Sequence, residues 1–117
     1  PIRLKIRNET RSCTFGVQMA YVTVLPGNTY ENKWYWAAYS MGVSDLYYLL
    51  NYYYFYKNGG GYGAYAETMK NNVQLTIKKN GAVLHEVTIA KGQTVSAIPN
   101  DRLDNSWETL ELILRDL

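Results

Sequence analysis

Short segments in which apolar and polar residues alternate, with turn signals between them, are the feature that most restricts the fold of this chain. In the first segment, Ile2, Leu4 and Ile6 alternate with arginine and lysine. Residues 73–78 repeat the alternation with valine, leucine and isoleucine. A period of two residues places the apolar side chains on one face of an extended strand, whereas a helix requires a period near 3.6. The sequence therefore predicts a fold built from half-buried β-strands.

Further strands are predicted between these two segments and after them. Residues 13–24 are rich in β-branched and aromatic residues and lead to the turn signal Pro26-Gly27-Asn28, after which residues 29–39 are predicted to form the returning strand. A short strand is predicted over residues 94–98. The leucines of residues 107–117 fit either a strand or one face of a helix, and the tight turns before them favour a strand.

Residues 73–89 have the pattern of a β-hairpin around Asn80-Gly81. A plain two-residue turn would put the valine and isoleucine residues of the second strand on the wrong face. A three-residue loop, Lys79-Asn80-Gly81, with Gly81 in the left-handed conformation, instead gives matching apolar pairs, Ile77 with Val83 and Val73 with Val87. Matching of the apolar faces therefore predicts the three-residue loop.

About seven short strands at turn-marked intervals in a chain of 117 residues predict a single domain, residues 1–117, that is mainly β, with a β-sandwich or jelly-roll fold. One segment departs from this pattern. Residues 44–57 begin with Ser44-Asp45 and end before Asn58-Gly59, which is the punctuation of a helix, although Tyr52–Tyr56 is a run of strong β-formers. A short helix is predicted there.

Aromatic residues are concentrated in one block of the chain. Eleven of the twelve tyrosines lie between Tyr30 and Tyr65, and only four charged residues interrupt this block, which we call the Tyr-rich segment. Tyrosine is abundant where one end of the ring is dry and the other forms a hydrogen bond, as at interfaces and ligand grooves. The segment is therefore predicted to be a contact surface, with a large aromatic core as the alternative. The residues assigned to the surface are Tyr30, Trp34, Tyr35, Trp36, Tyr52, Tyr54, Tyr56, Tyr62 and Tyr65.

Residues capable of catalysis or metal binding are few. Cys13 is the single cysteine and His85 the single histidine, so neither has a recognisable partner set for nucleophilic catalysis or metal binding. The acidic group that begins at Asp101 does not follow the spacing of an EF-hand calcium loop. We therefore predict that the protein is not an enzyme and uses no cofactor or metal. A net charge of +2, with no aromatic residues among the basic residues near the N-terminus, argues against nucleic-acid binding.

The Tyr-rich segment has one family resemblance. Residues 30–36, together with Asp45-Leu46-Tyr47-Tyr48, resemble the aromatic headgroup-binding region of actinoporin pore-forming toxins. The chain lacks the N-terminal amphipathic helix of that family, since its first segment has the pattern of a strand. The resemblance implies a surface chemistry suited to lipid headgroups.

Three functions are compatible with such a surface. The first is permanent contact between subunits, because a Tyr-dense surface almost without charge is costly to expose to water. This function predicts a homo-oligomeric structural subunit of a virion or cell-surface appendage, in an extracellular setting. The second is a glycan-binding module that stacks sugars on the aromatic rings, and the third is a membrane-active, pore-forming-like protein that contacts the membrane surface. We expect the first.

Overall fold

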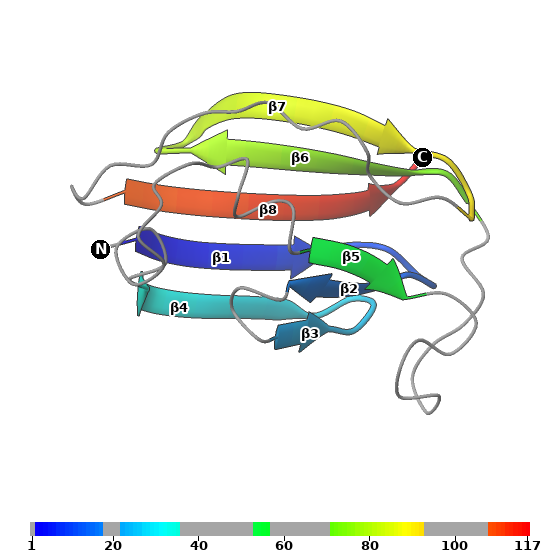
Figure 1. The fold of residues 1–117 in the computed structure, drawn as a ribbon, viewed down its shortest axis with the longest axis horizontal. Helices are drawn as coiled ribbons and strands as arrows, with labels where there is room; N and C mark the ends of the chain where they lie inside the picture. The colour runs from blue at the N-terminus through cyan, green and yellow to red at the C-terminus, as the bar shows by residue number, and fades with distance from the viewer. Residues whose placement is uncertain (1, 18–21, 36–52, 57–70, 93–107) are drawn as a thin grey trace.

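The computed structural model describes residues 2–17, 22–35, 53–56, 71–92 and 108–117, which form a mainly β structure (Figure 1). Within these ranges there are eight strands and no helix. The strands are β1 (Ile2–Asn8), β2 (Thr14–Val17), β3 (Val22–Val24), β4 (Thr29–Tyr35), β5 (Tyr53–Tyr56), β6 (Val73–Lys79), β7 (Ala82–Ile89) and β8 (Glu108–Asp116). The predicted mainly β fold class is confirmed.

The strands form two sheets. The larger has five strands in the order β4-β1-β8-β6-β7, and the smaller has three in the order β3-β2-β5. Neighbouring strands are antiparallel except β1 and β8, which run parallel side by side at the centre of the larger sheet (Figure 1). The first and last described strands are therefore direct neighbours.

One face of the five-stranded sheet forms an apolar core, as the alternating pattern predicts. The register aligns apolar residues across the strands, so that Ile6 lies beside Leu112 and Leu112 lies opposite Ile77. The fully buried large side chains of this face are Leu4, Ile6, Leu75, Ile77, Leu110, Leu112 and Leu114. Burial of each such side chain contributes roughly 1.5–3 kcal/mol, so a polar residue at any of these positions would remove a large part of the stability.

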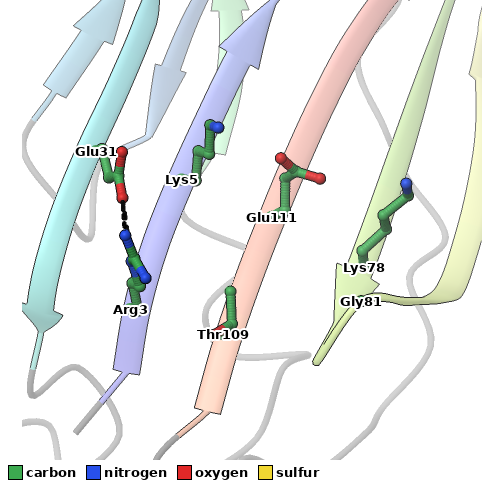
Figure 2. Close-up of a pocket in the computed structure, with 7 residues that line it drawn as sticks. All are labelled: Arg3, Lys5, Glu31, Lys78, Gly81, Thr109 and Glu111. Atoms are coloured by element: carbon green, nitrogen blue, oxygen red, sulfur yellow. Dashed lines mark hydrogen bonds and ion pairs between the residues drawn. The ribbon is translucent and has the colours of Figure 1, made fainter.

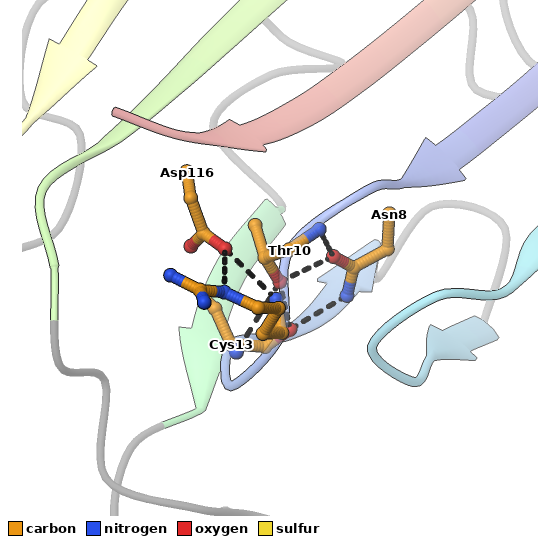
Figure 3. Close-up of polar contacts among 5 residues, drawn as sticks. Asn8, Thr10, Cys13 and Asp116 are labelled. Carbon is orange, nitrogen blue, oxygen red and sulfur yellow. Dashed lines mark hydrogen bonds and ion pairs between the residues drawn. The ribbon is translucent and has the colours of Figure 1, made fainter.

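A polar junction ties the end of β1 to the smaller sheet (Figure 3). Asn8 is 1% exposed, and its Nδ2 donates hydrogen bonds to the carbonyl oxygens of Cys13 at 2.6 Å and of Val24 at 2.9 Å. Its Oδ1 accepts hydrogen bonds from the N–H of Thr10 at 3.1 Å and from the Thr10 hydroxyl at 2.6 Å. Because Cys13 immediately precedes β2 and Val24 ends β3, one side chain fixes both to β1. We call this cluster the Asn8 junction.

The hairpin of β6 and β7 has a shorter turn than predicted. Asn80 and Gly81 form the turn, with φ of 52° and 84°, the left-handed values that a two-residue hairpin turn requires. A β-bulge follows, because Ile77 pairs with His85 while Lys78 pairs with Val83, which leaves Leu84 as an extra residue. The predicted three-residue loop and its register are therefore wrong. The bulge restores the apolar match in another way, giving the pairs Leu75 with Val87 and Val73 with Ile89.

Two other predicted elements also differ. Tyr53–Tyr56 forms β5, paired with β2, so the described part of the predicted helix 44–57 is a strand, because strong β-formers outweigh the helix punctuation. The turn at Pro26-Gly27 does not return β4 along β3; β4 pairs with β1 in the other sheet. The strand predicted within residues 107–117 is confirmed as β8. The rest of the predicted helix and the predicted strand 94–98 lie outside the described residues.

Candidate functional site

The Tyr-rich segment contributes an outermost strand to each sheet. Its beginning lies in β4, the last strand on one side of the five-stranded sheet. Its middle forms β5, the last strand on one side of the three-stranded sheet (Figure 1). In the order of the described strands, β4 and β5 thus each have one neighbour. The open side of an edge strand offers backbone N–H and C=O groups to another strand.

Tyr30 is the predicted contact residue whose side chain the structure describes. It is half-buried and pairs with Ile6, on the apolar side of β4. Between Asn32 and Tyr35, β4 has one more residue than the paired part of β1, which is a β-bulge. The other predicted residues within strands are Trp34 in β4, Tyr35 opposite Ile2, Tyr54 opposite Gly16 and Tyr56 opposite Thr14. Trp36, Tyr52, Tyr62 and Tyr65 lie outside the described residues.

The face of the five-stranded sheet opposite the core carries a row of charges (Figure 2). Glu31 lies opposite Lys5, Lys5 lies beside Glu111, and Glu111 lies opposite Lys78. Adjacent strands are about 4.8 Å apart, so the row places alternating charges at that spacing across four strands. A hollow of about 300 Å³ over this row is lined by Arg3, Lys5, Glu31, Lys78, Gly81, Thr109 and Glu111.

Ion pairs occupy both carboxylates of this row. Arg3 Nη2 lies 2.7 Å from Glu31 Oε1, and Arg7 Nε lies 3.7 Å from Glu111 Oε2. Neither Lys5 nor Lys78 forms an ion pair with any described residue, so their ammonium groups are the unpaired cations of the hollow. Sequence reasoning missed this row because it considered the basic residues near the N-terminus only in relation to nucleic-acid binding. The available signal was the basic residue at every second position of the first strand, Arg3, Lys5 and Arg7.

The charged row is suited to reversible polar contact. The side chains of Arg3 and Glu31 are 48% and 37% exposed. Water and salt screen such a pair, which contributes at most about 1 kcal/mol. Its groups can therefore exchange their partners for hydroxyl or anionic groups of a ligand at little cost in stability.

Cys13 is buried and chemically inert at physiological pH. Burial, with a smaller contribution from the Asp116 carboxylate, raises the pKa of its thiol from 9.0 to about 12. A thiol that stays protonated is not a nucleophile or a metal ligand. Cys13 therefore contributes to the structure as a small buried side chain.

His85 lies on the apolar side of β7. It pairs with Ile77, and not with Leu75 as the predicted register required, because the bulge shifts the strand. The side chain is half-buried, and its Nε2 is buried without a hydrogen-bond partner among the described residues. Among all the residues that the structure describes, no three histidine, cysteine or carboxylate side chains form a group that could hold a metal ion.

The acidic group that begins at Asp101 falls largely outside the described ranges. Within those ranges, no helix has the length and apolar character needed to cross a bilayer. Comparison of the chain with models of protein families, with characterised proteins and with solved structures finds no match. Its function must therefore be inferred from the residues themselves.

Proposed function

We propose that this protein is a non-enzymatic structural subunit that self-associates through the Tyr-rich segment, and that its two sheets are the layers of a β-sandwich. The position of β5 is the observation that carries the proposal. This strand has the sequence Tyr-Tyr-Phe-Tyr and no charge, and it is the outermost described strand of the three-stranded sheet. An uncharged aromatic strand at a sheet edge is suited to pairing with another chain.

Edge strands of monomeric proteins usually carry lysine, proline or a bulge, which prevent pairing with other chains. β5 contains neither lysine nor proline, and its register with β2 is regular over all four residues. A strand from another copy would gain backbone hydrogen bonds there, while tyrosine rings supply contact area and hydroxyl groups. These properties support self-association over solvent exposure.

The state of the single cysteine is compatible with a non-enzymatic role. The thiol of Cys13 is buried with a raised pKa, so it does not supply a nucleophile. Permanent contacts between identical subunits are characteristic of virions and cell-surface appendages, and we place the protein in such an extracellular assembly. The Tyr-rich segment would then be buried in the assembly and exposed on the isolated subunit.

Alanine substitution of Tyr54 and of Tyr56 tests this function. We expect both variants to stay folded in thermal melts and to dissociate in light scattering over a concentration series. Interface aromatics commonly contribute about 2 kcal/mol or more, which corresponds to a roughly thirtyfold loss of affinity. Phe15→Leu is the matched core control, because Phe15 is fully buried. It should lower the melting temperature without selectively dissociating the assembly.

Two results would contradict the proposal. One is a wild-type protein that is monomeric at every concentration, and the other is unfolding of both tyrosine variants, which would make the segment a core. A monomer would favour a glycan-binding module, because Thr109, Glu111 and Lys5 of the hollow offer partners for sugar hydroxyls. Binding to a glycan array that is lost in Thr109→Val would support that second function.

A further inference from the structure

β7 forms the edge of the five-stranded sheet opposite β4. Its eight residues include one glutamate and one histidine, and no lysine, arginine or proline. Val83 in this strand is 56% exposed, one of two large apolar side chains exposed among the described residues. The bulge at Leu84 interrupts the strand near its start and leaves residues 85–89 regular. This edge therefore has a stretch of five regular residues that contains no lysine, arginine or proline, the residues that most often protect an edge.

The hydrogen bonds of β6 show which backbone groups of β7 face the open side. Leu117 N–H donates to the Asn72 carbonyl at 3.0 Å, and Asn80 N–H donates to the Thr109 carbonyl at 2.7 Å. Because hydrogen-bonded pairs alternate along an antiparallel ladder, the even-numbered residues of β6 bond to β8 and the odd-numbered residues bond to β7. The partners of those odd-numbered residues are His85, Val87 and Ile89. The residues between them, Glu86 and Thr88, therefore direct their backbone N–H and C=O groups away from β6, to the side of β7 on which no described strand lies.

We propose that β7 pairs antiparallel with β7 of a second copy of this chain, across a two-fold axis at Val87. In a ladder of this kind, residues with outward-directed backbone groups must lie opposite each other. Glu86 of one copy then lies opposite Thr88 of the second copy, and the same pair recurs on the other side of the axis. Val87 lies opposite Val87 of the second copy.

The side chains on both faces fit this register. The charged face has Glu86 opposite a threonine, with no pair of like charges. On the apolar face, the half-buried Val87 lies beside Val87 of the second copy. The apolar row that includes Leu75 and Val87 thus continues into the five-stranded sheet of that copy. An axis at Glu86 would instead place two carboxylates opposite each other, which is unfavourable. An axis at Thr88 would pair fewer residues of the strand.

This contact is separate from the Tyr-rich segment, because β4 is the opposite edge of the same sheet and β5 belongs to the other sheet. A two-fold contact through β7 alone closes a dimer. Combined with association through the Tyr-rich segment, it would extend the assembly in two directions.

Disulfide trapping tests the register. Opposed residues of a non-hydrogen-bonded pair have Cα atoms about 4.5 Å apart, which suits a disulfide. Val87→Cys should therefore form a covalent dimer under mild oxidation. Val83→Cys is the control, because position 83 is the more exposed of the two and would react more readily if dimers formed by random collision. Equal or faster cross-linking of Val83→Cys would overturn the proposal.

Opposite charges at one exposed position test the contact in solution. Thr88 is exposed, so the subunit should tolerate both Thr88→Glu and Thr88→Lys. The glutamate variant places two like-charge pairs across the axis and should weaken dimerisation about fivefold, whereas the lysine variant should strengthen it. Net charge alone predicts the reverse, because the protein carries +2. Light scattering that shows no difference, or the reverse order, would overturn the contact.

The same measurements separate this contact from the proposed function. Tyr54→Ala should leave the yield of the Val87→Cys dimer unchanged, because the two surfaces are at different edges. Failure of the disulfide test with intact tyrosine-dependent assembly would remove the β7 contact alone. Loss of tyrosine dependence with efficient Val87→Cys trapping would remove the proposed function alone.

Discussion

Replacement of Asn8 by alanine should weaken the attachment of the smaller sheet to β1. The substitution removes four hydrogen bonds, two donated and two accepted, with lengths from 2.6 to 3.1 Å, by a side chain that is 1% exposed. At about 1 kcal/mol net for each buried bond, the loss approaches about 4 kcal/mol. The Cys13 carbonyl keeps a contact with Thr10 Oγ1 at 3.0 Å. We therefore expect a loss of about 3 kcal/mol in the free energy of unfolding.

Urea unfolding followed by circular dichroism measures this loss as a shift of the midpoint at constant slope. Asn72→Ala is the matched control, because Asn72 is exposed and its Oδ1 accepts one hydrogen bond, from the Lys91 N–H at 2.9 Å. The control should lose less than about 1 kcal/mol. A loss for Asn8→Ala as small as that of the control would refute the view that the junction joins the two sheets.

Three further predictions concern the hairpin turn, the Cys13 thiol and the glycosylation pattern at Asn8. Gly81→Val should destabilise the hairpin by about 1–2 kcal/mol in the same assay, because φ is 84° there, and equal stability would contradict this expectation. Cys13, with a folded pKa of about 12 against 9.0, should make stability fall as pH rises from about 9 to about 12, since the unfolded thiol ionises first, and Cys13→Ser should flatten that part of the pH profile. Asn8-Glu9-Thr10 matches a glycosylation acceptor, but the Asn8 amide is buried and bonded, so folded protein incubated with an oligosaccharyltransferase should show no added mass while an unfolded peptide is modified.

Local patterns predicted the strands of this protein better than their connections. The alternation of Ile2, Leu4 and Ile6 identified both a strand and its buried face, because both depend on a period of two residues. The hairpin turn was predicted wrongly although the apolar match was sound. To bring the apolar faces of the two strands together, one extra residue is needed near the turn. The sequence does not determine whether this residue lengthens the loop or forms a bulge, as Leu84 does.

The charged hollow depended on contacts that no local pattern contains. Glu31, Lys5, Glu111 and Lys78 lie in four strands from distant parts of the chain. They meet only because β1 and β8 pair in parallel, a pairing that the chain order did not indicate. The position of β5 at an edge likewise follows from its pairing with β2, whereas its uncharged aromatic sequence was visible from the start.

The parallel pair at the centre of the larger sheet also determines the order in which this protein can fold. β1 is the first described strand to leave a ribosome and β8 is the last, so their loop closes across nearly the whole chain. Contacts of such high sequence separation slow folding towards the millisecond-to-second range. Until β8 arrives, the five-stranded sheet is limited to the pairs β4-β1 and β6-β7, and two-stranded ribbons are marginally stable in water. β8 supplies the neighbours of Leu4 and Ile6 on one side and of Leu75 and Ile77 on the other. A nascent chain that stalls before β8 is made therefore exposes two unpaired apolar edges, which are prone to aggregation.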